Sequence, residues 1–445
     1  MQNRVFVLGT NKQPLMPCHP ARARQLLKKG RAAVIRRFPF TIILLEREEG
    51  DLQPLRLKFD PGAEITGATI VGDFKRGKRC IYAMELTHRG KQIKESLRKR
   101  KGVRKSRRSR KTRYRKPRFK NRRRPKGWLA PSLQSRVDNI RAWTTRLRRA
   151  SPLTHLSMEL ARFDTQAMQN PEIHGVEYQQ GALCGYDVRE YLLEKWGRAC
   201  AYCKVQGVPL QIEHMRPKSR GGSNRVSNLT LACAACNQKK GTKTAKEFGF
   251  ADLEAKGKKP LKSAAFMNAT RFALLEQFKA TGLPLECGSG ARTKYNRSQQ
   301  AYQKAHWLDA MCVGESGEDV FVEARHEVME VKAMGRGSRQ MCLVNKHGFP
   351  RTGPKGPSRV QGFQTGDLVR ALVPKGKKKG SYEGRVAVRA SGSFNIKTRS
   401  GTVQGISWKY CRRIQSVDGY AYTRRQGVSS QPSRTGSPRH QERKF

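Results

Sequence analysis

Two C-x2-C pairs, separated by 29 residues, constrain the fold of this 445-residue chain more than any other feature. Their four thiolates, from Cys200, Cys203, Cys233 and Cys236, suffice to fill the tetrahedral shell of a structural zinc ion. Paired C-x2-C units in a basic chain without a recognisable secretory leader favour a metal over disulfides. The alternative, cysteines that only pack in a core, leaves their pairing unexplained. We therefore expect a zinc-stapled segment that needs no histidine ligand.

The segment between the cysteine pairs predicts a β-hairpin followed by a helix. LQIEH supplies one strand, NLTLAC the other, and AACNQKKG begins the helix, which brings Glu213, His214 and Asn237 towards one point. A histidine can activate water, and carboxylate and amide oxygens are ligands of hard cations; together they suit phosphodiester hydrolysis. The alternative is a zinc ribbon that only binds nucleic acid, which leaves the Glu-His pair without a role.

A second set of polar residues is spread along the chain. Asp60 ends the apolar strand LRLKFD, Glu159 lies near the end of LTHLSMEL, and His306 and Asp309 share one face of a predicted helix. Three carboxylates that converge can hold two Mg²⁺ ions about 4 Å apart, with the histidine as the base. Each residue alone is weak evidence, because an Asp before Pro-Gly is usually a turn residue. Their order along the chain is the stronger indication.

The charge of the chain predicts a polyanionic partner. Lys and Arg number 92 against 34 acidic residues, a formal net charge of +58. The run 91–126 holds 21 Lys or Arg in 36 residues and can form a helix of about 35 Å up to Tyr114. A solvated charge run would repel itself, and no apolar helical face accompanies it to favour a membrane surface. The arginines expected to contact nucleic-acid backbones are Arg98, Arg100, Arg104, Arg107, Arg108, Arg110 and Arg113.

The rest of the chain predicts a multidomain α/β protein. Helical patterns occupy 177–196, 264–282 and 297–314, short alternating strands follow from 366 to 414, and the last twenty or so residues have the composition of a disordered tail. No apolar run is long enough to span a membrane, and the first residues lack a secretory signal. We expect a cytoplasmic protein.

The hairpin segment resembles the HNH endonuclease motif, which has a ββα-metal fold. The resemblance implies that His214 is the general base, that Asn228 positions it, and that Glu213 and Asn237 hold one Mg²⁺. FDPG, MELAR and HWLDA resemble, in order, the three split motifs of RuvC nucleases, whose fold is RNase H-like. That resemblance implies two Mg²⁺ ions bound by Asp60, Glu159 and Asp309, with His306 as the base.

The combination of both motif sets with an Arg-rich run is similar to the IscB family, transposon-associated relatives of the type II CRISPR effector nucleases. NKQPLMP at residues 11–17 matches the motif that names the first domain of that family. The resemblance implies a RuvC core split by an Arg-rich bridge helix and a zinc-stapled HNH insert, with a small N-terminal α/β domain and a C-terminal β-barrel-like domain. The expected domains are PLMP 1–53, RuvC-I 54–90, bridge helix 91–126, RuvC-II 127–190, HNH 191–248, RuvC-III 249–335, RNA-interacting segment 336–365, β domain 366–422 and disordered basic tail 423–445.

The resemblance also implies a function. The protein would be a monomer in a ribonucleoprotein with a structured ωRNA whose guide pairs with one strand of double-stranded target DNA. HNH would cut the guide-paired strand, RuvC the displaced strand, and the β domain would read a short target-adjacent motif. Two alternatives are a guide-independent homing or junction-cleaving nuclease and an RNA-binding protein with decayed nuclease motifs. Candidates for base reading, chosen from alternating runs in a basic domain, are Arg385, Arg389, Lys397 and Arg399.

Overall fold

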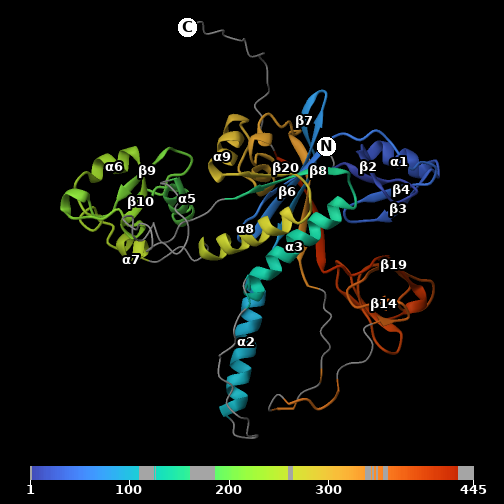
Figure 1. Ribbon diagram of the computed structural model, residues 1–445. Coiled ribbons are helices and arrows are strands. Elements are labelled where there is room, and N and C mark those ends of the chain that lie inside the picture. Colours follow the sequence, from blue (N-terminus) through green and yellow to red (C-terminus); the bar gives the residue numbers. More distant parts are fainter. Residues whose placement is uncertain are drawn as a thin grey trace.

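The computed structural model describes residues 3–109, 127–160, 186–258, 264–335 and 359–428, with a few isolated residues between them. It is a mixed α/β structure of several modules arranged around one large sheet, as expected (Figure 1). The N-terminal unit lies on one side of this sheet and the cysteine-containing module on the opposite side, while a single long helix projects from the centre.

The large sheet has seven strands in the order β11-β8-β5-β6-β7-β12-β20. Strands β5, β6 and β7 form an antiparallel meander, and β8 and then β11 extend it in parallel beside β5. Strand β12 adds in parallel to β7, and β20 closes that end in antiparallel pairing. The strands are β5 (Leu55–Asp60), β6 (Ile65–Phe74), β7 (Gly77–Thr87), β8 (Leu153–Glu159), β11 (Leu285–Gly288), β12 (Arg325–Ala333) and β20 (Tyr420–Val428).

Side chains of β5 alternate between two covered faces of the sheet. Leu57 and Phe59 are fully buried in the core that contains α3 and α8, with Phe59 stacked on Phe278 at 5.3 Å between ring centroids. Lys58 and Asp60 point to the opposite face, because successive side chains of a strand alternate. Helix α10 packs on that second face. The helices are α3 (Pro131–Arg148), α8 (Ala264–Lys279), α9 (Gly290–Gln299), α10 (His306–Met311) and the 3₁₀ turn η4 (Glu315–Gly317).

Two expectations from the sequence are corrected here. The helical pattern over 297–314 is divided into α9 and α10, because Ala301 adopts a left-handed conformation (φ 54°) and the chain turns there. Residues 423–428, expected in the disordered tail, form the greater part of β20. That strand pairs with β12 over its whole length, and ion pairs of Arg424 and Arg425 with Glu327 and Glu330 satisfy its charge.

The N-terminal unit is a four-stranded sheet with one helix against it. The strand order is β2-β1-β4-β3, with β1 and β4 parallel and the other pairs antiparallel. Its small core includes Val5, Ala23 and Ile42. The edge strands of this sheet are β2 and β3. The elements are β1 (Val5–Leu8), β2 (Pro14–Cys18), α1 (Pro20–Lys28), β3 (Ala32–Arg36) and β4 (Thr41–Leu44).

The Arg-rich run forms α2 (Gly90–Ser109) as far as the structure describes it, and α2 leads away from α3 (Figure 1). The cysteine-containing module has a separate core around Tyr202, Leu231 and Leu253. Its elements are α5 (Tyr186–Lys195), β9 (Leu210–His214), the 3₁₀ turns η2 (Lys218–Arg220) and η3 (Val226–Asn228), β10 (Leu229–Cys233), α6 (Ala234–Lys240) and α7 (Asp252–Lys258).

The C-terminal unit is an antiparallel sheet in the order β18-β17-β16-β15-β19. Its end strands, β18 and β19, do not pair with each other in the described part of the chain, so the order is that of an open sheet. Most of the segment 336–358 lies outside the described residues. The elements are β13 (Arg359–Val360), β14 (Phe363–Gln364), β15 (Leu368–Val373), β16 (Gly380–Ala387), β17 (Ser393–Lys397), β18 (Thr402–Ser407), η5 (Trp408–Tyr410) and β19 (Cys411–Gln415).

Among the helices that the structure describes, none has both the length and the apolar composition needed to cross a bilayer.

Candidate functional site

Three carboxylates from distant parts of the sequence meet at one edge of the large sheet. Strands β5 and β8 run in parallel with Phe59 opposite Met158, so Asp60 and Glu159 leave neighbouring strand ends roughly 5 Å apart. Asp309 comes from α10, which packs on β5 and β6, and it lies close enough to interact electrostatically with both other carboxylates. We call Asp60, Glu159 and Asp309 the acidic cluster.

A glycine lets α10 approach the acidic cluster. Gly67 on β6 pairs with Asp60, and a Cβ atom on Gly67 would lie 1.8 Å from the carbonyl oxygen of His306. The start of α10 therefore rests directly on the strand beside Asp60. The imidazole Nδ1 of His306 lies 3.9 Å from Oδ2 of Asp60, and interaction with that carboxylate raises the pKa of His306.

Two arginines that the sequence analysis did not single out pair with the acidic cluster. Arg271 of α8 lies 3.2 Å from Oε1 of Glu159, and Nε of Arg297 on α9 lies 2.8 Å from Oδ1 of Asp309. Both arginines come from helices that join the site only through the tertiary fold. No local signal marked them, because each stands in an ordinary helical pattern.

The electrostatics of the acidic cluster favour a bound cation. Burial, and then the charge of Asp60, raise the pKa of Glu159 to about 8 and that of Asp309 to about 6. The carboxylates thus repel one another despite their arginine partners, and each of those ion pairs engages one carboxylate oxygen. Three converging carboxylates are the donor set that Mg²⁺ prefers, so the cluster fits such ions.

A buried polar network lies next to the acidic cluster on the same face of the sheet. Two of its members, Lys58 and Ser157, stand two residues before Asp60 and Glu159 on β5 and β8. Lys58 is fully buried and its Nζ donates to Oγ of Ser316 at 2.8 Å. Ser157 donates to the carboxylate of Glu286 at 2.6 Å, Ser316 donates to it as well, and Arg56 lies 3.4 Å away. Burial lowers the pKa of Lys58 to about 7. For Glu286, burial raises the pKa, but the hydrogen bonds from Ser157 and Ser316 outweigh it and lower the pKa to about 2. We call this the Lys58 network.

The four cysteines of the two C-x2-C pairs form one cluster. Their sulfur atoms all lie within 4.8 Å of one another, and Sγ of Cys203 is 3.7 Å from Sγ of Cys233. Four thiols at this spacing are compatible with the predicted structural zinc. The cluster joins the turn before β9 to the junction of β10 and α6, so it holds both ends of the hairpin.

His214 ends β9 and lies opposite Leu229 of β10. One ring nitrogen, Nε2, is 3.0 Å from Oδ1 of Asn224, a residue that the sequence analysis did not select. Asn228, expected to position the base, hydrogen-bonds the backbone of the loop that follows His214, at Arg216 and Ser223. Asn228 thus shapes the loop that carries Asn224.

Glu213 does not fit a metal site in this arrangement. Its side chain is only 6% exposed, Tyr202 donates to one carboxylate oxygen at 2.6 Å, and Nζ of Lys240 lies 2.5 Å from the other. Lys240 is itself buried and also donates to the His214 carbonyl. Asn237 lies nearby on α6, where its amide nitrogen donates to Gln211. A lysine therefore already neutralises the carboxylate predicted to hold Mg²⁺.

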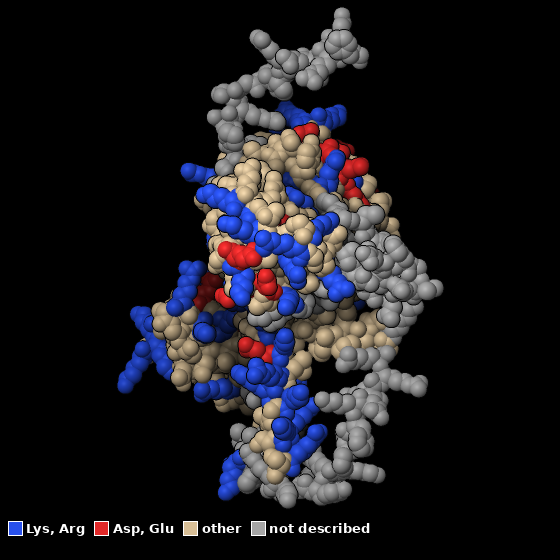
Figure 2. Space-filling model, turned by 90° about the vertical axis from the view of Figure 1, so that its left-hand side faces the viewer, with Lys and Arg blue, Asp and Glu red and all other residues tan. Residues whose placement is uncertain are grey.

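Basic side chains follow the exposed surface of α2. Arg98, Arg100, Arg104 and Arg108 are exposed, whereas Arg110 and Arg113 lie outside the described residues and only the backbone of Arg107 is described. Figure 2 shows Lys and Arg gathered along the projecting part of the molecule with few acidic residues among them. A long cationic helix with free sides suits the backbones of a nucleic acid.

One of the four base-reading candidates has another role. Arg385 donates through its guanidinium to the carbonyl oxygens of Gly366 and Tyr420, both at 2.7 Å. It therefore joins the C-terminal sheet to the start of β20. Arg389 and Arg399 remain candidates on exposed turns, and Lys397 remains one at the exposed end of β17.

Comparison with known families agrees with two parts of this geometry. Residues 5–181, which include α2 and the strands of Asp60 and Glu159, match the family of RRXRR proteins, and residues 200–253 match HNH endonucleases. No curated protein matches the chain.

Solved structures with some likeness are Cas9 proteins. Streptococcus thermophilus Cas9 bound to the AGAA PAM is 11% identical, over 58% of this chain and 32% of that one, with a TM-score of 0.20. The type II-C Cas9 of Actinomyces naeslundii is 16% identical, over 41% and 31%, with a TM-score of 0.15. The matched part spans about a third of the length of those proteins.

The two family matches follow each other along one chain, the first running through the Arg-rich helix and the second covering the cysteine-stapled hairpin. The chain thus carries, in this order, a segment similar to RRXRR proteins and a segment similar to HNH endonucleases.

Proposed function

We propose that this protein is an RNA-guided DNA endonuclease with two cutting centres. The observation that carries the proposal is the convergence of Asp60, Glu159 and Asp309, with His306 beside them, in the same chain as an HNH module. In this proposal the HNH module cuts the guide-paired DNA strand and the acidic cluster cuts the displaced strand.

The topology around the acidic cluster supports the second cutting centre. Numbered along the chain, β5, β6, β7, β8 and β11 lie in the order 3-2-1-4-5, with an antiparallel meander followed by two parallel strands. This is the arrangement of an RNase H-like sheet, which the resemblance to RuvC motifs implies. Its first and fourth strands end at Asp60 and Glu159.

At the acidic cluster, the residues would hold two Mg²⁺ ions and prepare a water molecule for attack on phosphorus. Bound Mg²⁺ would neutralise charge on the scissile phosphate and on the leaving oxygen. His306, whose ring is held beside Asp60, would take the proton of the water. Arg271 and Arg297 would fix the orientation of two of the carboxylates.

In the HNH module, the ring of His214 is the group that would take a proton from water. Asn224 orients this ring, and Asn228 holds the loop that carries Asn224. The predicted Mg²⁺ at Glu213 and Asn237 has no place while Lys240 occupies the Glu213 carboxylate. We therefore derive no metal-dependent step for this centre.

A structured RNA is the partner that the charge of the protein favours. The exposed arginines of α2 would contact the backbones of RNA and of the guide–DNA duplex by shape, without reading sequence. The chain between α2 and α3 has room for no further large domain, so the RNA would supply much of the complex. The C-terminal sheet would contact DNA beside the guide-paired segment.

The test combines RNA sequencing with strand-resolved cutting. The protein is purified from cells that also carry the non-coding DNA next to its gene, and the RNA that copurifies is sequenced. A double-stranded DNA that matches the variable end of this RNA is then incubated with the complex and Mg²⁺. We expect one dominant RNA. We also expect His214→Ala to abolish cutting of the guide-paired strand alone and Asp60→Ala to abolish cutting of the displaced strand alone.

Target binding by each variant, measured in a gel-shift assay, provides the control. Loss of both cuts from either substitution, in protein that still binds the target, would contradict the assignment of two separate centres. Efficient cutting by RNA-free protein would favour a guide-independent nuclease.

A further inference from the structure

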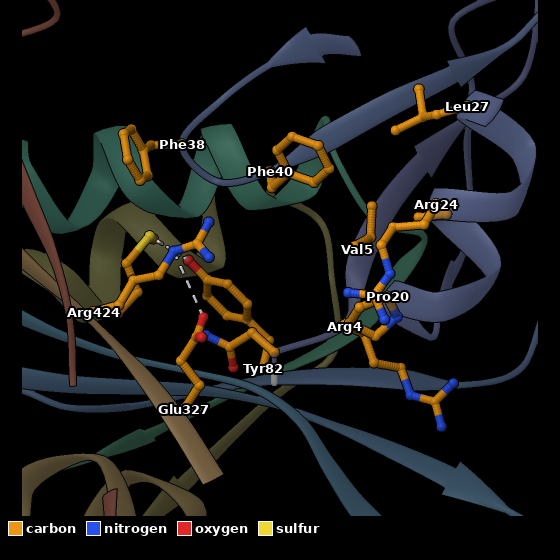
Figure 3. A pocket seen from close by; sticks show the side chains of 13 residues that line it. Arg4, Val5, Pro20, Arg24, Leu27, Phe38, Phe40, Tyr82, Glu327 and Arg424 are labelled. Carbon is orange, nitrogen blue, oxygen red and sulfur yellow. Dashed lines mark hydrogen bonds and ion pairs between the residues drawn. The ribbon is translucent and has the colours of Figure 1, made fainter. Parts of the chain in front are cut away.

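The N-terminal unit and the large sheet enclose a cavity that neither nuclease centre uses. Its volume is about 270 Å³, and its walls come from β1, α1 and the turn before β4 on one side and from β7, β12 and β20 on the other. Figure 3 shows side chains of both units around this space. We call it the interdomain cavity.

Aromatic rings form much of its apolar surface. Phe38, Phe40 and Tyr82 line the cavity, and Tyr82 is held in place by its packing on Phe6 and by the contact of its hydroxyl with Sδ of Met329 at 3.7 Å. Phe38 stacks on Tyr422 at 4.6 Å, which fixes its ring as well. Phe38 and Phe40 are part-exposed and offer ring surface to a ligand, whereas Tyr82 is buried. A ring that is held by its neighbours loses little entropy when a ligand contacts it.

Guanidinium groups surround this aromatic surface. Arg424 lies 3.7 Å from Glu327, the one acidic residue among the residues that line the cavity. Arg4 and Arg24 line it as well, and among the described residues no carboxylate forms an ion pair with either of them. In Figure 3 these two arginines lie on the opposite side of the view from Phe38 and Arg424. The cavity therefore carries more positive than negative charge.

We propose that the interdomain cavity binds a single unstacked nucleotide, with its base against the aromatic rings and its phosphate at Arg4 and Arg24. Aromatic rings stack on any base, and arginine forms paired hydrogen bonds with phosphate. A plain anion would leave the aromatic surface uncovered, and an apolar ligand would leave the arginines without a counter-ion. The volume of about 270 Å³ lies just below the range of ligand pockets, which is about 300–1,000 Å³, so it suits one nucleotide and nothing larger.

The nucleotide can come from two sources, a free nucleoside monophosphate or one nucleotide extruded from bound RNA. The second source rests on the proposed function, and the first does not. In either case the ligand contacts residues of both units at once. Binding would thus fix the N-terminal unit on the sheet.

Binding of free AMP and UMP to the full-length, RNA-free protein tests the first source by calorimetric titration. Arg24→Ala removes an arginine of the cavity, and Arg22→Ala removes an exposed arginine of the same helix that does not line it. We expect saturable binding that Arg24→Ala weakens about tenfold and Arg22→Ala leaves unchanged. Equal weakening by both variants would show unspecific attraction and overturn the site.

Ultraviolet crosslinking of the RNA-bound protein, followed by mass spectrometry of its peptides, tests the second source. We expect one nucleotide on the peptide that contains Phe38 and Phe40, reduced by Arg24→Ala but not by Arg22→Ala. Either result, free binding or this crosslink, supports the site, and the absence of both overturns it. Neither the titration nor the crosslink requires DNA cutting. Failure of the proposed nuclease function and failure of the nucleotide site can therefore be told apart.

Discussion

The hairpin centre and the acidic cluster differ in how the chain builds them. Every hairpin residue discussed above comes from residues 200–240, and four cysteines hold the two ends together. The acidic cluster joins residues 60, 159 and 309, which meet only because three distant elements pack on one sheet. The hairpin centre is built from one short segment that the four cysteines hold together, whereas the acidic cluster depends on the packing of the whole large sheet.

The two centres also treat negative charge differently. Glu213 is buried against Lys240 and Tyr202, so its charge is already balanced within the module. In the acidic cluster, burial and then the charge of Asp60 raise the pKa of Glu159 and of Asp309, although both have arginine partners. A carboxylate beside a histidine is therefore structural in the hairpin module and a candidate metal ligand in the acidic cluster.

The largest effect should come from removing the cysteine cluster. Structural zinc contributes roughly 10–16 kcal/mol to folding, so the double substitution Cys200→Ser and Cys233→Ser should unfold the hairpin module and leave the large sheet folded. The zinc content measured by elemental analysis should fall from one ion per chain to none, and trypsin should cleave the variant first within residues 191–258. Cys287→Ser, at an exposed cysteine of β11, is the control. If the hairpin module and the large sheet unfolded together in the double variant, the hairpin module would not be a separately stabilised unit.

Replacing Lys240 should affect the hairpin centre next most strongly. Lys240→Met leaves the Glu213 carboxylate buried without its cation and should cost about 3–5 kcal/mol, whereas Tyr202→Phe removes one hydrogen bond and should cost about 1 kcal/mol. Hydrogen exchange of the β9 and β10 amides measures both changes. If Lys240→Met did not change the stability, the Glu213 carboxylate would not depend on this lysine and would be free to act as a ligand. The two centres would then not differ in how their carboxylates are balanced.

The Lys58 network offers the matching experiment in the large sheet. Lys58→Met should cost about 2–3 kcal/mol, because it removes a buried donor and leaves Glu286 without its nearest buried lysine. Urea unfolding monitored by the buried Trp143 and Trp307 measures this loss. Lys75→Met, at an exposed lysine in the turn after β6, should have almost no effect. Equal stability of the two variants would show that the network does not hold these strands.

Acid should weaken the large sheet before it weakens the hairpin centre. Burial lowers the pKa of His88 to about 3 and that of His326 to about 4, so both imidazoles are neutral when folded. The unfolded chain takes up these protons near pH 6.5; the stabilisation is complete above that pH and is lost as the pH falls towards 4. We expect a loss of about 2 kcal/mol for each of the two histidines between pH 7 and pH 5.

Urea unfolding at the two pH values measures this effect through Trp307, which stacks on His326 at 5.8 Å. The double variant His88→Gln and His326→Gln should show a flatter pH dependence. An unchanged slope in that variant would place the acid sensitivity elsewhere.

Much of the hairpin module could be predicted because its information is local. The two strands, the helix after them and the cysteine cluster all appear where the spacing indicated. Asn224 was missed, because its contact with His214 depends on the path of the loop that Asn228 holds. The pairing of Glu213 with Lys240 was missed for a related reason, since the pattern of residues does not reveal which side of the hairpin α6 covers.

The large sheet was less predictable. The strands of Asp60 and Glu159 mix apolar with polar residues and could be recognised singly, but only the tertiary structure shows that they are neighbours in the sheet. Strand β20 was taken for tail because its basic composition is balanced only by glutamates of β12 and β7. Arg271 and Arg297 carry no local signal at all.

The sequence by itself determined the cysteine cluster, the hairpin between its arms, and a charge that calls for a polyanionic partner. These follow from spacing and composition, which need no knowledge of distant contacts. Only the tertiary structure decided which carboxylates are neutralised by a neighbouring cation and which are crowded together, and which units enclose a cavity. The physical reason is that burial and charge pairing depend on elements far apart in the chain, whose meeting is settled by packing of the sheet and its helices.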